Sequence, residues 1–217
     1  MAKATTQNIE QVRKPIKPGI IIAEFIGTFS LAFAVLASIN GSLSPAIPTP
    51  VIAGFTLMLA VLSIGGLSGA HINPAVTIGL LSIRKISVRG AIAYLVAQIA
   101  GAVAALGLLT LLLPDKVIGV ASNTSNWTVF SGEMLGAIIF TFGIAAAVEQ
   151  EFQRISAAVL VGGSLLLGII FASVASNGVL NPAVAITIHS ATWAYILGPI
   201  VGAVIGMNLE RFMRKAA

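Results

Sequence analysis

The 217-residue chain contains no cysteine, so a disulfide framework and a thiolate metal site are both excluded. Charged residues are scarce as well: they make up 9% of the chain, against about 25% in an average soluble domain. Hydrophobic residues account for 57% of the chain, and the mean hydropathy is +1.01. These values exclude an ordinary soluble domain and predict a protein that spans a membrane.

Residues that carry chemistry are equally rare. The chain has two histidines, and it offers no credible nucleophile–base pair, metal-binding cluster or pair of carboxylates on one helix face. We therefore expect no enzyme activity, no cofactor and no metal. The formal net charge of +5 would suggest nucleic acid in a soluble protein, but here the basic residues lie in the breaks between apolar segments. Nucleic acid is therefore not an expected partner.

Six long apolar segments match the length of a membrane crossing. A helix needs about 20 residues to cross a hydrocarbon core of about 30 Å. The segments are roughly 19–40, 51–66, 88–113, 127–148, 155–175 and 191–208. The second is short, and its helix could begin inside the proline-containing stretch 45–50. We predict a polar cytoplasmic tail over residues 1–17 and a single channel-like domain over residues 18–217.

The basic residues predict the orientation in the membrane. Eleven of the twelve lie before the first segment, between the second and third, between the fourth and fifth, or after the sixth. Only Lys116 lies in an alternate loop. Because Lys and Arg accumulate in cytoplasmic loops, we predict a multi-pass protein of the cell membrane with both termini in the cytoplasm.

An internal repeat divides the chain. The stretch AEFIGTFSLAF at 23–33 resembles GEMLGAIIFTF at 132–142, and an Asn-Pro-Ala triplet occurs at both 73–75 and 181–183. The first match has an offset of 109 residues and the second an offset of 108. Three crossings in each half turn the second half upside down relative to the first. The pattern predicts an inverted repeat, with repeat one at about 18–113 and repeat two at about 127–213.

The two Asn-Pro-Ala triplets predict a pair of re-entrant half-helices. Asn is a favourable N-cap and Pro suits the first helical position, so Asn73-Pro74-Ala75 reads as a helix start. Asn181-Pro182-Ala183 reads as a second start from the opposite side. A single Asn-Pro is usually a turn, but two copies at the repeat offset favour half-helices. Their positive dipole ends and amides would meet at the centre of the membrane, which is suited to a pore for neutral, oxygen-bearing solutes.

The sequence resembles the aquaporin, or major intrinsic protein, family over about residues 20–208. The resemblance is carried by AEFIGT at 23–28, SGAHINPAVT at 68–77, Gln98 in AYLVAQIAGA, Glu133, LNPAVA at 180–185 and LGPIVG at 197–202. It implies an all-α membrane protein of six tilted transmembrane helices plus two half-helices. It also implies one pore per subunit and assembly as a homotetramer in the lipid bilayer.

Glu24 and Glu133 are the acids that lie well inside apolar segments. An intramembrane acid is a candidate proton-coupling site. The resemblance instead implies that both glutamates accept hydrogen bonds from the re-entrant loops, and their matching positions in the two repeats favour this supporting role. The resemblance also implies that His71 lines the pore; a buried structural histidine is the alternative. His189 lies outside any motif, and we assign it no role.

The sequence departs from the family at the narrow outer constriction. Most members have Arg directly after the second Asn-Pro-Ala, whereas this chain has Val184. Counting from the motifs places Ala53, Ile169 and Gly178 at the other constriction positions, a pattern that fits neither the water-specific nor the glycerol subclass. This apolar ring should be wider than a water-only filter.

We therefore predict a passive channel for water, with a small neutral solute such as glycerol as a further candidate. The alternative is a secondary transporter, which would share the inverted repeat. A transporter should contain further ionisable residues near the centre of the membrane, and beyond the two glutamates the sequence has none there.

Overall fold

Six long helices form the body of the protein in the computed structural model, which describes residues 16–40, 47–114 and 125–216. Each is long and apolar enough to cross a membrane. They are α2 (Pro18–Ile39), α3 (Thr49–Ser68), α5 (Val88–Leu112), α6 (Trp127–Glu149), α7 (Arg154–Ala172) and α9 (Trp193–Ala216). They match the six predicted segments. Most of the predicted tail, residues 1–15, lies outside the described residues.

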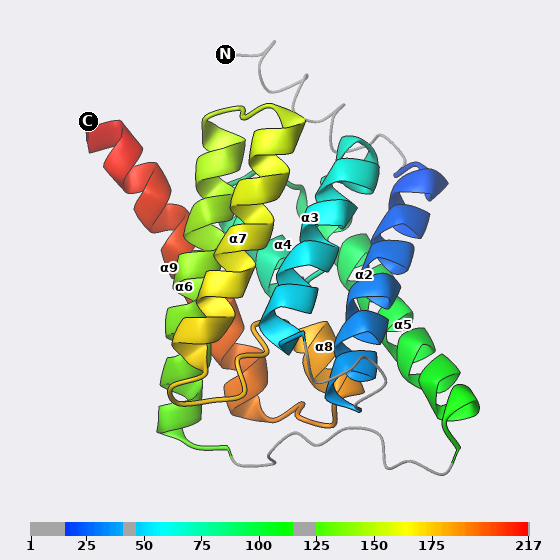
Figure 1. The fold of residues 1–217 in the computed structure, drawn as a ribbon. Coiled ribbons are helices and arrows are strands. Elements are labelled where there is room, and N and C mark those ends of the chain that lie inside the picture. Colours follow the sequence, from blue (N-terminus) through cyan, green and yellow to red (C-terminus); the bar gives the residue numbers. More distant parts are fainter. Residues whose placement is uncertain (1–15, 41–46, 115–124, 217) are drawn as a thin grey trace.

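Two short helices lie inside the bundle, α4 (Pro74–Ser82) and α8 (Pro182–Thr187). Figure 1 shows α4 in the half of the bundle where α2 begins and α8 in the opposite half. We call the end where α2 begins and α9 ends the inner end, and the opposite end the outer end. The half-helices thus approach the middle of the bundle from opposite sides, as the inverted repeat predicts.

The C-terminal ends of three helices differ clearly from the prediction, and the largest difference is at α9, which continues to Ala216, eight residues past the predicted boundary at 208. α3 begins at Thr49, inside the proline-containing stretch as predicted, but it ends at Ser68, two residues past the predicted boundary, because Gly69 turns left-handed at a φ of 87°. α7 ends at Ala172, three residues before the predicted boundary. There, the backbone N–H groups of Ala175 and Ser176 both donate to the carbonyl of Ala172, which closes a turn. This turn directs the chain back into the bundle toward α8.

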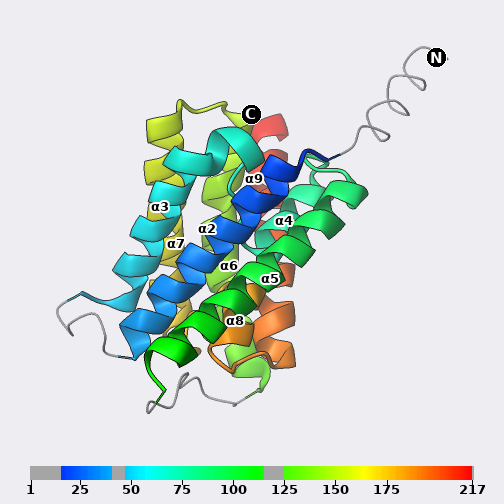
Figure 2. The same ribbon diagram turned by 90° about the vertical axis from the view of Figure 1, so that its right-hand side faces the viewer.

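Glycines bring the main helix pairs together in both repeats. α2 packs along α5, and α6 packs along α9 (Figure 2). A Cβ at Gly101 of α5 would overlap the carbonyl oxygen of Phe25, and one at Gly202 of α9 would overlap that of Met134. Small residues allow helix backbones to approach closely in membranes, where packing rather than water exclusion drives association. These pairs hold the frame that surrounds α4 and α8.

Candidate pore

Each half-helix starts with an asparagine that caps it. The side-chain Oδ1 of Asn73 accepts a hydrogen bond from the backbone N–H of Ala75 (2.8 Å). The Oδ1 of Asn181 accepts from the N–H groups of Ala183 (3.0 Å) and Val184 (3.4 Å). Proline follows each asparagine at the first helical position, where its missing N–H has no cost. The local sequence therefore sets where both half-helices begin.

The two caps are also tied to one another across the repeat. The amide Nδ2 of Asn73 donates to the carbonyl of Leu180 (2.9 Å), and the Nδ2 of Asn181 donates to the carbonyl of Ile72 (3.1 Å). Each amide group has two hydrogens, so one remains on each asparagine for another acceptor. The geometry brings two amide donors and two helix N-termini together at the centre of the bundle.

Glu24 holds the loop that leads into α4. It is fully buried, and its carboxylate accepts hydrogen bonds from the Ser68 hydroxyl (2.6 Å), the His71 N–H (3.0 Å) and the Ile72 N–H (2.8 Å). Ile72 needs such support because its φ is 39°, a left-handed conformation that is unusual for a β-branched residue. The carboxylate keeps this strained segment in place beside Asn73.

Glu133 holds the equivalent loop of the second repeat. This carboxylate is also fully buried and accepts from the Ser176 hydroxyl (2.7 Å), the Val179 N–H (2.9 Å) and the Leu180 N–H (2.7 Å). Leu180 is left-handed as well, with a φ of 53°. Hydrogen bonds from fixed donors can offset part of the cost of burying a carboxylate. The two glutamates therefore have the same geometric relation to their loops.

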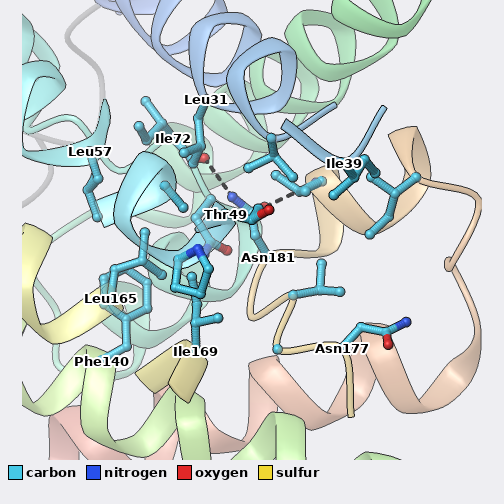
Figure 3. A pocket seen from close by; sticks show the side chains of 18 of the residues that line it. Leu31, Ile39, Thr49, Leu57, Ile72, Phe140, Leu165, Ile169, Asn177 and Asn181 are labelled. Atoms are coloured by element: carbon cyan, nitrogen blue, oxygen red, sulfur yellow. Dashed lines mark hydrogen bonds between the residues drawn. The ribbon is translucent and has the colours of Figure 1, made fainter. Parts of the chain in front are cut away.

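An outer cavity of about 310 Å³ reaches from the outer end of the bundle to the two asparagines. Figure 3 shows Asn181 among apolar side chains that include Leu165 and Ile169. The four residues that we predicted to form the constriction all line this cavity: Ala53, Ile169, Gly178 and Val184. None of the described residues that line it is Asp, Glu, Lys or Arg. The outer half is therefore uncharged and mostly apolar.

Gly178 and Ile169 are close neighbours in this cavity. A Cβ at Gly178 would lie 2.8 Å from the carbonyl oxygen of Ile169 and 2.9 Å from its Cγ2. The φ of Gly178 is 63°, which glycine adopts at no steric cost. A side chain at position 178 would therefore both strain the loop and fill the space beside Ile169.

An inner cavity of about 650 Å³ opens at the other end. His71 lines both cavities, so it marks the boundary between them. In contrast with the outer cavity, the inner one is lined by the charged residues Lys85, Glu151 and Arg154. Lys85 forms an ion pair with Glu149 (3.2 Å between Nζ and Oε1). In the sequence, Lys85 and Arg154 indicate only the orientation in the membrane, and their spacing does not predict that they line a cavity.

The hydrogen-bond partners of the His71 side chain could not be predicted from the sequence. Its Nδ1 lies 3.2 Å from the Thr77 hydroxyl, which accepts a hydrogen bond from Nε2 of Gln98 (2.9 Å). The same Nε2 donates to Glu24 (2.8 Å). Val179 occupies the equivalent position in the second repeat, 108 residues after His71. The inner side of the asparagine pair is therefore more polar than the outer side. His189 is exposed and lines neither cavity.

Comparison with known proteins decides the family. The family model described as Major intrinsic protein matches residues 11–209. The chain belongs to the major intrinsic protein family.

Relatives of this major intrinsic protein include Nodulin-26 from Glycine max, which is 33% identical over 213 residues, 90% of this chain and 79% of Nodulin-26. Aquaporin NIP1-3 from Oryza sativa subsp. japonica is 33% identical over 214 residues, 90% of this chain and 74% of that protein. Among solved structures, the aquaglyceroporin from Plasmodium falciparum superposes with a TM-score of 0.72 at 24% identity. That match covers 90% of this chain and 94% of the other.

Membership of the major intrinsic protein family confirms two predictions. The fold is all-α, with six membrane-crossing helices and the aquaporin-like arrangement. The class of activity is a passive channel for water and small solutes in a membrane, not an enzyme. The secondary-transporter alternative is not favoured.

Proposed function

We propose that solutes cross this protein through the outer cavity, between Asn73 and Asn181, and out through the inner cavity. The observation that carries this proposal is the reciprocal asparagine pair at the floor of an uncharged cavity. Each amide retains one hydrogen to donate to a passing oxygen. The N-termini of α4 and α8 add positive partial charge at the same point, which disfavours cations.

We propose that Ala53, Ile169, Gly178 and Val184 form the outer constriction and that water and small uncharged solutes such as glycerol pass it. The outer cavity, at about 310 Å³, is large beside a water molecule, which takes up about 30 Å³ of liquid volume. Its walls offer apolar contact to a carbon backbone, and the asparagines offer donors to hydroxyl oxygens. The names of the relatives, which include aquaporins, agree with this substrate class.

The two buried glutamates are supports rather than coupling sites in this proposal. Each carboxylate accepts at least three hydrogen bonds, one from a serine hydroxyl and two from backbone N–H groups of the loop that leads into the half-helix. Neither lines the outer or the inner cavity. A group that exchanges protons with a transported solute would need access to the solute path, and these groups have none.

We further propose that the protein lies in the cell membrane as a homotetramer with both termini in the cytoplasm. The distribution of eleven of the twelve basic residues supports the orientation. Exposed apolar side chains on α3 and α7, such as Phe55 and Ile170, provide apolar surface for contacts between subunits. Labelling of a cysteine introduced at the end of α9, from either side of sealed vesicles, tests the orientation. The mass of the complex in detergent tests the assembly.

Stopped-flow light scattering on proteoliposomes tests the proposed transport. We expect water and glycerol permeability both to exceed those of empty liposomes, and neither to depend on a proton gradient. Solute accumulation against its own gradient, driven by protons, would contradict the passive pore and favour the transporter.

A further inference from the structure

A groove separate from the two cavities lies at the inner end, where α2 and α5 begin and α3 ends. It encloses about 500 Å³. Its apolar lining includes Ile20 of α2, Leu67 of α3 and the ring of Tyr94 on α5. The Tyr94 hydroxyl is already used, because it donates to the carbonyl of Ser68 (2.6 Å). We call this feature the interfacial groove, since it lies where the membrane-crossing helices start.

Exposed apolar side chains continue from the groove along the outside of the bundle. Ile22 and Ile26 of α2 are 54% and 51% exposed, and Ile92 and Val96 of α5 are 58% and 65% exposed. α2 and α5 lie beside one another (Figures 1 and 2). In a multi-pass membrane protein such a surface contacts lipid chains. The groove therefore sits at the headgroup end of a surface that lipid tails can follow.

Among the described residues, the charged side chains at or next to the groove are basic. Lys17 lines it, and Arg89 precedes the lining residue Gly90 in the first turn of α5. None of the described residues that line the groove is acidic. Of the acids in the described part of the chain, Glu24 is buried under its loop, and the others belong to α6, α9 and the α6–α7 link of the second repeat. The groove is thus complementary to an anion that approaches from the membrane surface.

We propose that the interfacial groove binds the headgroup of an anionic phospholipid, with its phosphate beside Lys17 and its acyl chains along α2 and α5. Basic pockets between helices at a membrane surface recognise such headgroups, and each nearby Lys or Arg contributes about 1 kcal/mol. The positive ends of α2 and α5, which both begin at the groove, act in the same direction. The proposal depends on the protein being in a membrane and not on which solute crosses the pore.

The test uses the full-length protein in phosphatidylcholine nanodiscs that contain increasing fractions of phosphatidylglycerol. We expect the melting temperature to rise and then saturate as phosphatidylglycerol increases. Lys17→Gln should need about fivefold more phosphatidylglycerol for the half-maximal rise, the factor that corresponds to one lost contact. Lys215→Gln removes an exposed charge at the same end but outside the groove, and should behave as the wild type.

A second variant blocks the groove without a change in charge. A Cβ at Gly19 meets no atom within 4 Å, so Gly19→Phe should fold and fill the groove, and the lipid-dependent rise should disappear. Gly107 of α5 is equally open, and Gly107→Phe is the matched control.

Three results would overturn the proposal. The first is identical lipid dependence in Lys17→Gln and Lys215→Gln. The second is a loss of stability of Gly19→Phe, relative to the wild type, that is as large in pure phosphatidylcholine as in discs with phosphatidylglycerol. This would mean that another part of the chain occupies the groove. The third is the same rise from inorganic phosphate added without phosphatidylglycerol, which would assign the site to a free anion.

Discussion

Asn73 and Asn181 each use both ends of one side-chain amide. The oxygen caps the asparagine's own half-helix, and the nitrogen donates to the loop of the other repeat. The sequence predicted the capping, because an Asn-Pro start needs only local geometry. It could not predict the donation across the repeat, since Asn73 and Leu180 are 107 positions apart and their contact depends on how the two loops meet.

Replacing either asparagine with aspartate should weaken both the exclusion of cations and the fold. The substituted carboxylate keeps the cap but places an oxygen opposite the carbonyl of Leu180 or Ile72, where a donor stood. It also puts negative charge at the two positive helix ends. We expect Asn73→Asp and Asn181→Asp to behave alike, with increased potassium or proton leak or a reduced folded yield. Unchanged water flux and ion exclusion in both variants would remove the asparagines from the mechanism.

Replacing either buried glutamate with alanine should lower stability. Glu24→Ala leaves the N–H groups of His71 and Ile72 without their acceptor, and Glu133→Ala does the same to Val179 and Leu180. Each unsatisfied buried donor costs about 1–3 kcal/mol. We expect a lower melting temperature in detergent for both.

Glu151→Ala is the control for the two glutamate variants, because it removes an exposed acid and should change little. If the glutamates coupled protons to transport, the alanine variants would instead keep their stability and lose a proton-driven flux.

Among the elements, the six long helices were predictable because apolar length alone determines them. The half-helices were predictable in position but not in length. α4 has nine residues and α8 has six, although the repeat would predict equal lengths. α8 stops at Thr187, and His189 just beyond it is left-handed with a φ of 56°. No residue type in that stretch indicates such a turn, so it follows from packing rather than local sequence.

Helix pairing supplies a prediction at the scale of elements. A Cβ at Gly101 or Gly202 would overlap a backbone carbonyl of the facing helix, which cannot move aside as a side chain can. Gly101→Leu and Gly202→Leu should therefore force α2 from α5 and α6 from α9. Overpacking of this kind costs about 1–3 kcal/mol or more. Thermal unfolding in detergent measures the effect. Gly107→Leu is the control and should be neutral, because a Cβ at Gly107 meets no atom within 4 Å. Equal stability of all three variants would contradict the close packing.

For the whole molecule, the two ends of the proposed pore differ in chemistry. The outer cavity is uncharged, whereas the inner cavity contains Lys85, Glu151 and Arg154. Gly178 and Val184 could be placed from the sequence because each lies within three residues of the second Asn-Pro-Ala. Ala53 and Ile169 were placed by counting along helices, and all four line one cavity. Their role as a constriction stays a prediction, because lining a cavity does not by itself set what passes.

The most direct test of the proposed pore is the ratio of glycerol to water permeability, measured in the same proteoliposomes for the wild type and for Val184→Arg. The substitution places a long, always charged side chain with five donors in the cavity that Ala53, Ile169 and Gly178 also line. If these residues form a wide, uncharged constriction, the ratio should fall, because glycerol flux decreases more than water flux. Any proton leak should fall as well. Equal loss of both fluxes in a well-folded variant, with the ratio unchanged, would mean that the native constriction is already narrow and would contradict the account.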